Sequence, residues 1–189
     1  MTRKPEPRLV WMDLEMTGLD PERCAIVQMA IIITDHELRQ LAEPLDVVVW
    51  QPDSVLETMS PFVRDMHQRS GLLDKIRSSP VALEDAERMG LELITAHAPF
   101  RTARLCGNSI GQDRRFLYAY MPALENYLHY RQIDVSTLKE LAGWWYDVRF
   151  EKTDVHGEKH TALYDIRQSI EELRFYREHI MQSGAAQGG

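Results

Sequence analysis

The chain has 189 residues, 44% of them hydrophobic and 27% charged; this composition is typical of a globular protein, and the length predicts one domain over residues 8–180. Its longest apolar run, MAIII at 29–33, is far shorter than the ~20 residues that a membrane span needs, which excludes a membrane-spanning helix. The formal net charge of −7 argues against binding of long duplex nucleic acid, since proteins that do so usually carry a basic surface.

The two ends of the chain are expected to lie outside this domain, residues 1–7 as a flexible N-terminal arm and residues 181–189 as a disordered tail. The arm is not followed by the apolar stretch of a signal peptide. The two cysteines, Cys24 and Cys106, lack metal-type spacing. Unbridged thiols suit a reducing compartment, so we expect a cytoplasmic protein.

Three strands are expected in the N-terminal part of the chain, at residues 8–15, 25–35 and 38–50. The first, RLVWMDLE, begins with residues that are apolar on both faces, which is typical of a central strand. The second is rich in isoleucine, which favours strands. Because the connections are short, we expect an antiparallel meander.

Beyond Pro80, helical periodicity alternates with two short strands. Ala82, Ala86, Met89 and Leu93 recur at spacings of four, three and four, which predicts an amphipathic helix. The other expected elements are strands at 103–108 and 131–135, helices at 111–122, 136–145 and 161–180, and a mobile polar loop at 147–159.

The order of these elements predicts the fold class. Strands that are joined through helical crossovers extend a sheet in parallel. The prediction is therefore an α/β domain with a mixed five-stranded sheet, made of a three-stranded antiparallel meander plus two parallel strands, flanked by helices. Ser136 is the expected N-cap of the helix at 136–145. No element is assigned to residues 51–80.

Two carboxylates, Asp13 and Glu15, stand at the end of the first apolar strand. Residues two apart in a strand point to the same side, so both carboxylates face one way. Burying an unpaired carboxylate costs several kcal/mol, and two on one face also repel each other. Polar residues that simply finish a strand are one explanation. A hard divalent cation bound by carboxylate oxygens is the other.

Three further residues complete a candidate metal site. Asp113 lies in the first turn of the helix after the fourth strand, and Asp165 lies early in the last helix, where acids also occur simply to complement the helix dipole. His160 lies just before that helix. If these residues converge on Asp13 and Glu15, four carboxylates hold two cations ~4 Å apart, the arrangement used for in-line attack on phosphodiesters.

The motifs WMDLEMTGLDP, GQD and HTALYD resemble those of the DEDD exonucleases of the histidine subtype, which implies a ribonuclease-H-like exonuclease fold. Within that group the chain resembles the oligoribonuclease family over about Leu9 to His179. The segments that point to this family are SPFVRDMHQRSGL, LCGNSIGQDRRF and YRQIDVSTLKEL. The family usually carries an acidic residue at the position of Tyr164, which departs from the pattern.

The resemblance implies a 3′-to-5′ exoribonuclease that degrades RNA of about two to five nucleotides to nucleoside 5′-monophosphates with two divalent cations, manganese or magnesium. It also implies a homodimer. The implied metal ligands are Asp13, Glu15, Asp113 and Asp165, and the implied general base is His160. The implied substrate contacts within one subunit are Met16, His67, Ser109 and Leu19, of which Leu19 wedges against a base. Tyr130 and Arg131 are implied to reach into the partner's site, and Tyr130 is also counted as catalytic.

Several of these residues have a plainer explanation from the sequence alone. Leu19 could be a turn residue that covers the core, His67 could lie on a helix surface, and Tyr130 and Arg131 could be an ordinary pair at a strand edge. The aromatic run at 144–146, WWY, is typical of a core or a dimer interface more than of a surface on which bases stack.

Two other functions remain open. A DNA-directed proofreading-type exonuclease of the same superfamily is distinguished by substrate, because contacts to the 2′-hydroxyl make RNA the better substrate of an RNase. A non-catalytic nucleotide-binding module is a more remote alternative, because such a module has no need of the metal-ligand acids, and all four are present here with the histidine.

Overall fold

The computed structural model describes residues 6–151 and 161–181. Within them, five strands pair into one sheet in the order β3-β2-β1-β4-β5. Neighbouring strands are antiparallel from β3 to β1 and parallel from β1 to β5. The predicted mixed sheet is confirmed. The strands are β1 Arg8–Met16, β2 Ile26–Asp35, β3 Leu45–Val48, β4 Arg104–Gly107 and β5 Gln132–Asp134.

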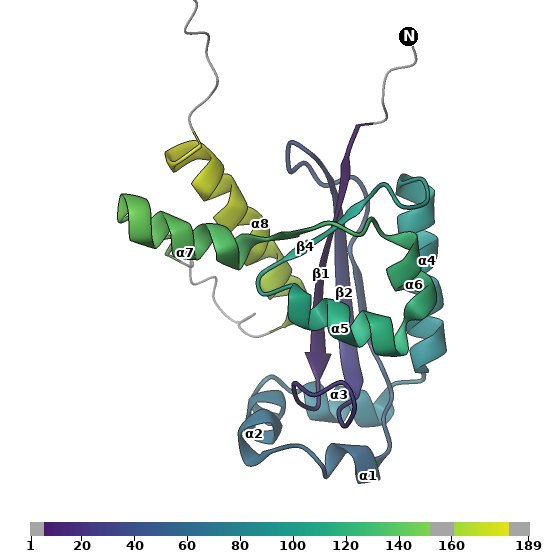
Figure 1. The fold of residues 1–189 in the computed structure, drawn as a ribbon. Coiled ribbons are helices and arrows are strands. Elements are labelled where there is room, and N and C mark those ends of the chain that lie inside the picture. The colour runs from purple at the N-terminus through teal and green to yellow at the C-terminus, as the bar shows by residue number, and fades with distance from the viewer. Residues whose placement is uncertain (1–5, 152–160, 182–189) are drawn as a thin grey trace, which may run out of the picture.

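Helices cover both faces of the sheet and one of its ends (Figure 1). Those of the described residues are α1 Asp53–Leu56, α2 Pro61–Arg69, α3 Leu72–Ser78, α4 Leu83–His97, α5 Gly111–Tyr120, α6 Pro122–Tyr127, α7 Val135–Tyr146 and α8 Ala162–His179. Alternate residues of β1 enter two cores. Met12 and Leu14 pack with α4, α5 and α6, whereas Leu9 and Trp11 pack with α7 and α8. Both faces of the sheet are thus covered, which explains why β2 is buried at every position.

Residues 51–80, for which no element was expected, contain α1, α2 and α3. The start of α2 is marked by Pro61 at the first position and by Ser60, whose Oγ accepts a hydrogen bond from the N–H of Val63. The buried residues of α1 and α3 form a third cluster with Val27 of β2. These helices lie beyond the carboxyl end of β1 (Figure 1), so they border the candidate site.

The expected strand at 38–50 is too long. Only Leu45–Val48 pairs with β2 as a strand, and Gln40 forms a single bridge with Thr34. The chain turns before Gln40, because the Asp35 carboxylate accepts backbone N–H bonds from Glu37 and Arg39 at 2.9 Å. The first residues of the expected strand therefore belong to this turn.

Two helix boundaries also differ from the prediction. The helix expected at 111–122 ends at Tyr120, and Pro122 begins α6, where its missing N–H is tolerated at the first position. The cap of α7 is Asp134 and not Ser136, because the Asp134 carboxylate accepts the Ser136 N–H at 3.0 Å. None of the helices in the described ranges combines the length and apolar character needed to cross a bilayer.

The predicted arm, polar loop and tail lie largely outside the described residues. Residues 6–7 and 147–151 are irregular, and 181 follows the end of α8. Ranges 1–5, 152–160 and 182–189 are not described, and His160 falls in the second of them.

Candidate active site

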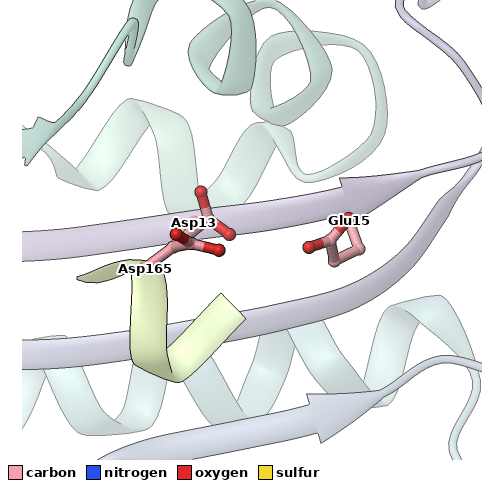
Figure 2. Close-up of side chains that lie close together, drawn as sticks. All are labelled: Asp13, Glu15 and Asp165. Atoms are coloured by element: carbon pink, nitrogen blue, oxygen red, sulfur yellow. The ribbon is translucent and has the colours of Figure 1, made fainter. Parts of the chain in front are cut away.

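Three of the predicted carboxylates meet at the carboxyl end of β1. Asp13 and Glu15 project from β1 toward the first turn of α8, which carries Asp165 (Figure 2). One oxygen from each of these three residues lies within 4.8 Å of the others. The start of α8 is set by Thr161, whose side chain accepts the Tyr164 N–H and so places Asp165 in the first turn. The strand period and this cap together bring the three oxygens into one place.

Asp113 flanks this cluster from the other side of β1. β4 pairs with β1 only as far as Trp11, so the last residues of β1 extend beyond it. There α5 begins, and Asp113 Oδ1 accepts the backbone N–H of Leu14 at 2.9 Å. Asp113 is close enough for its charge to act on Glu15, although it is not one of the three residues whose oxygens gather.

The electrostatics of the site favour a bound cation. Burial, followed by the charges of Asp165 and Asp113, raises the pKa of Glu15 to about 7. Burial also raises the pKa of Asp113 to about 7, and the hydrogen bond from Leu14 only partly opposes this. A divalent cation among these oxygens would stabilise the ionised forms. Oxygen-only ligands of this kind suit Mg²⁺ or Mn²⁺.

His67 lies behind the carboxylates rather than on a helix surface. Its side chain is 1% exposed, and its Nε2–H donates to the carbonyl oxygen of Met16 at 2.9 Å. Its Nδ1 lies 4.0 Å from Glu15 Oε2. Burial lowers the pKa of His67, so the neutral ring is favoured. The histidine therefore holds the end of β1 through the Met16 carbonyl and lies beside Glu15.

Leu19 protrudes from the turn after β1. Its side chain is 71% exposed, so it does not cover the core. Its carbonyl oxygen accepts a hydrogen bond from Gln112, the residue before Asp113, and the turn is therefore tied to α5. Met16, in contrast, is half-buried against the core cluster of α4 to α6.

Ser109 stands exposed between β4 and α5 with φ at +49°, a left-handed conformation that is unusual for serine. Its N–H donates to Asp134 Oδ1 at 3.0 Å and to Ser136 Oγ at 2.9 Å. Strained backbone of this kind persists where surrounding contacts hold it, and it gathers at functional sites.

The remaining predicted residues lie at the surface. Tyr130 is 72% exposed and Arg131 is exposed. Trp144, Trp145 and Tyr146 at the end of α7 are also exposed, which excludes a core role for that aromatic run. Tyr164, where the family carries an acid, is buried.

The sequence reasoning missed Gln112, which ties the Leu19 turn to α5, and Arg114, which holds the backbone of Tyr130. Both stand beside Asp113 in the GQDRR segment, so the only local sign of them was their place next to a predicted metal ligand.

Comparison with known proteins identifies the family. Residues 10–173 match the RNase_T family, which is described as Exonuclease. The oligoribonuclease of Pseudomonas syringae pv. tomato is 53% identical over 175 residues, which cover 92% of this chain and 96% of that protein. The oligoribonuclease of Bordetella pertussis is 48% identical over 177 residues, which cover 94% of this chain and 97% of that protein. The chain belongs to the oligoribonuclease family of exonucleases.

Solved structures of exonuclease I share the fold. The enzyme from Methylocaldum szegediense aligns with a TM-score of 0.69 and 20% identity over 93% of this chain. Escherichia coli exonuclease I in complex with a dT13 oligonucleotide aligns with a TM-score of 0.68 and 17% identity over 91% of this chain. The oligoribonuclease-family chain spans 41% of each of those longer chains. The predicted exonuclease fold is confirmed.

Membership of an exonuclease family implies a nucleic acid substrate and divalent metal ions. The cluster of Asp13, Glu15 and Asp165 supplies oxygen ligands of the kind that such ions bind. The family resemblance drawn from the sequence motifs is thereby confirmed.

Proposed function

We propose that the protein is a 3′-to-5′ exoribonuclease that degrades RNA of about two to five nucleotides to nucleoside 5′-monophosphates. The observation that carries this proposal is the convergence of Asp13, Glu15 and Asp165 in a chain of the oligoribonuclease family. Bound cations would explain the acids at the end of an apolar strand.

The proposed metal ligands are Asp13, Glu15, Asp113 and Asp165, and the proposed cofactors are two Mg²⁺ or Mn²⁺ ions. When bound, the ions would lower the pKa of a water molecule and stabilise the charge that develops on the departing 3′ oxygen. The raised pKa values of Glu15 and Asp113 support this set, because a carboxyl kept neutral by burial becomes a good ligand once a cation offsets its charge.

His160 is proposed as the general base that removes the proton of the attacking water. A histidine has an unperturbed pKa near ~6.5, so its neutral form, which can accept that proton, becomes dominant above this pH. Activity should therefore rise from mildly acidic to alkaline pH.

The proposed RNA contacts surround the carboxylates. The 71% exposed side chain of Leu19 is free to wedge against a base, and Ser109, whose hydroxyl lies 3.3 Å from Ser136 Oγ, is exposed just before α5. Met16 and His67 also belong to the proposed set of RNA contacts. The buried ring of His67 lies beside Glu15.

We further propose that the protein acts as a homodimer in which Tyr130 and Arg131 of one subunit enter the site of the other. Both side chains are exposed and have no core to cover. Beside them, an open hollow of about 600 Å³ is lined by residues of α5 and by Pro21, Glu125 and Gln132, and Tyr118 on its wall is 75% exposed. A second copy that covers this hollow would remove apolar surface from water.

The test is cleavage of a labelled RNA dinucleotide, a long single-stranded RNA and a DNA of matched sequence, each with Mn²⁺, with Mg²⁺ and with chelator. Rapid metal-dependent cleavage of the dinucleotide and slow cleavage of the long chains is expected. Equal or faster degradation of the DNA would support the proofreading-type alternative, and no cleavage at all would support a binding module.

His160→Ala tests the base. We expect its rate to fall by about 10²- to 10⁴-fold, the usual contribution of general base catalysis, and the rise of activity with pH to disappear. His36→Ala, which removes an exposed histidine from the turn after β2, serves as the matched control. A His160→Ala profile that still rises with the same apparent pKa would exclude His160 as the base.

A further inference from the structure

Arg114 joins three parts of the structure beside the exposed Tyr130. Its guanidinium donates to the carbonyl oxygen of Tyr130 at 3.0 Å and to that of His129 at 3.1 Å. It also donates to Glu125 Oε1, through Nε at 3.1 Å and Nη2 at 2.8 Å. The planar fork of an arginine can hold all these acceptors at once, which a lysine cannot do.

The ion pair between Arg114 and Glu125 is shielded from water. The two side chains are only 16% and 19% exposed, unlike the surface pairs elsewhere on this chain, such as Arg88 with Asp85 and Glu92. An ion pair in this position is screened less by salt and fixes its partners more firmly than an exposed pair does.

The segment that Arg114 holds is ordered by its own contacts, although Tyr130 projects into solvent. The ring of His129 stacks on that of Tyr130 with centroids 4.6 Å apart, and the guanidinium of Arg131 lies 5.4 Å from the centre of the Tyr130 ring. The Arg131 N–H donates to His129 Nδ1 at 3.0 Å. An exposed tyrosine with no part in the core is therefore held in one orientation.

Arg114 also connects this segment to the catalytic carboxylates. It directly follows Asp113, whose carboxylate is bonded to Leu14 of β1. The first turns of α5 thus contact the metal site through Asp113 and the backbone of Tyr130 through Arg114. Tyr130 is therefore connected to the sheet through α5, by the bond of Arg114 to its carbonyl and that of Asp113 to β1.

We propose that Arg114, with Glu125, is a positioning residue for the reaction. It presents Tyr130 and Arg131 in the conformation that the partner subunit's active site requires to enclose a short RNA. This inference rests on the proposed homodimer. It predicts that the loss of Arg114 impairs the partner's site and not the site of its own subunit.

The first test compares three variants in the full-length protein. Arg114→Met keeps the aliphatic stem, Arg114→Lys keeps the charge, and Glu125→Gln keeps the shape of its partner. We expect kcat/KM for an RNA dinucleotide to fall by about ten- to a hundredfold in Arg114→Met, the size expected from a misplaced contact group, and little recovery in Arg114→Lys. Arg88→Met, which removes an exposed ion-pair cluster on α4, should be unaffected.

The deciding test uses hybrid dimers of differently tagged subunits. One subunit carries Asp13→Asn, which disables its own site but leaves Arg114 and Tyr130 intact, and the other carries Arg114→Met. We expect about half of the wild-type activity, because the single intact metal site receives a well-placed Tyr130 from the Asp13→Asn subunit. A hybrid as poor as the Arg114→Met homodimer would show that Arg114 serves its own site and would overturn the proposal.

A parallel hybrid of Tyr130→Ala with Asp13→Asn separates this proposal from the proposed function. If that hybrid is rescued and the Arg114→Met hybrid is not, only the role of Arg114 fails. If neither is rescued, or if the wild-type protein is a monomer by sedimentation, the trans arrangement itself fails. An Arg114→Met protein that sediments as a monomer would also overturn the proposal, since the pair would then hold the interface and not Tyr130.

Discussion

Glu15 and Asp113 should make the stability of the metal-free protein depend on pH. Their pKa values are raised to about 7 from ordinary values of 4.5 and 3.8. Between these values the folded state binds more protons than the unfolded state, so their contribution to stability is full below the unfolded pKa and is lost as the pH rises through about 7. We expect the melting temperature in chelator to fall over this range, measured by calorimetry.

Glu15→Gln is the control for this pH dependence. It removes one of the two groups, so its melting temperature should change less with pH than that of the wild type. Because the ligands must be ionised to bind a metal, the stabilisation by Mn²⁺ should in turn grow over the same range. If the melting temperature depends on pH in the same way in the wild type and in Glu15→Gln, the raised pKa does not belong to Glu15.

His67 offers a second test at the scale of single residues. His67→Phe keeps a ring in the buried site but removes the bond to the Met16 carbonyl, which should cost about 1–3 kcal/mol of unfolding free energy. Because the ring also lies beside Glu15, we expect weaker binding of Mn²⁺ in calorimetric titrations without RNA. His67→Gln, which retains an N–H donor, should recover part of both. Normal Mn²⁺ affinity with a raised KM for RNA would instead make His67 a pure substrate contact.

Local patterns and family motifs located different parts of the site. Asp13 and Glu15 share a face because strand side chains alternate, whereas Asp113 and Asp165, each in the first turn of a helix, were expected to join them through the resemblance of the GQD and HTALYD motifs. The contact of His67 with Met16 spans 51 positions, and that of Gln112 with Leu19 spans 93. No local pattern encodes such contacts, because they exist only after the elements have packed.

At the scale of elements, Asp134 links the cap of α7 to the strained Ser109. Its Oδ1 accepts the N–H groups of both Ser136 and Ser109. Asp134→Ala should lower the unfolding free energy by about 0.5–2 kcal/mol, the usual cost of a lost N-cap. It should also raise the KM for an RNA dinucleotide, because Ser109 loses a contact that holds its left-handed backbone.

The conservative variant Asp134→Asn keeps the accepting oxygen and should restore both properties, as measured by denaturant unfolding and steady-state kinetics. If Asp134→Ala is destabilised but binds RNA with an unchanged KM, the bond to Ser109 has no part in substrate recognition.

The length of each helix explains whether it could be predicted from the sequence. The helices α4, α7 and α8 were located within a few residues because each is long enough to show a repeated apolar face. The helices α1 to α3 are 4, 9 and 7 residues long, too short to show that period clearly. Pro122 by itself predicts the end of a helix, although a proline also suits the first position of one.

At the scale of the whole molecule, the acidic charge constrains how RNA is held. Binding that depends on phosphate neutralisation weakens with salt, with a slope of log affinity against log salt of about −0.7 for each phosphate in a single strand. With a net charge of −7, this protein has no surplus of basic groups with which to follow a long backbone. An RNA dinucleotide offers only one or two phosphates, so its recognition must depend on enclosure.

We therefore expect log kcat/KM for an RNA dinucleotide to fall with log salt with a slope no steeper than about −1.5, since at most two phosphates are neutralised by side chains. Arg131→Ala should make that slope shallower by about 0.7, because Arg131 is an exposed cation of the proposed contact set. Arg88→Ala, on the exposed face of α4, should leave it unchanged. A slope several times steeper would mean that a basic surface holds a longer stretch of RNA, and the enclosure of short substrates by the dimer would have to be abandoned.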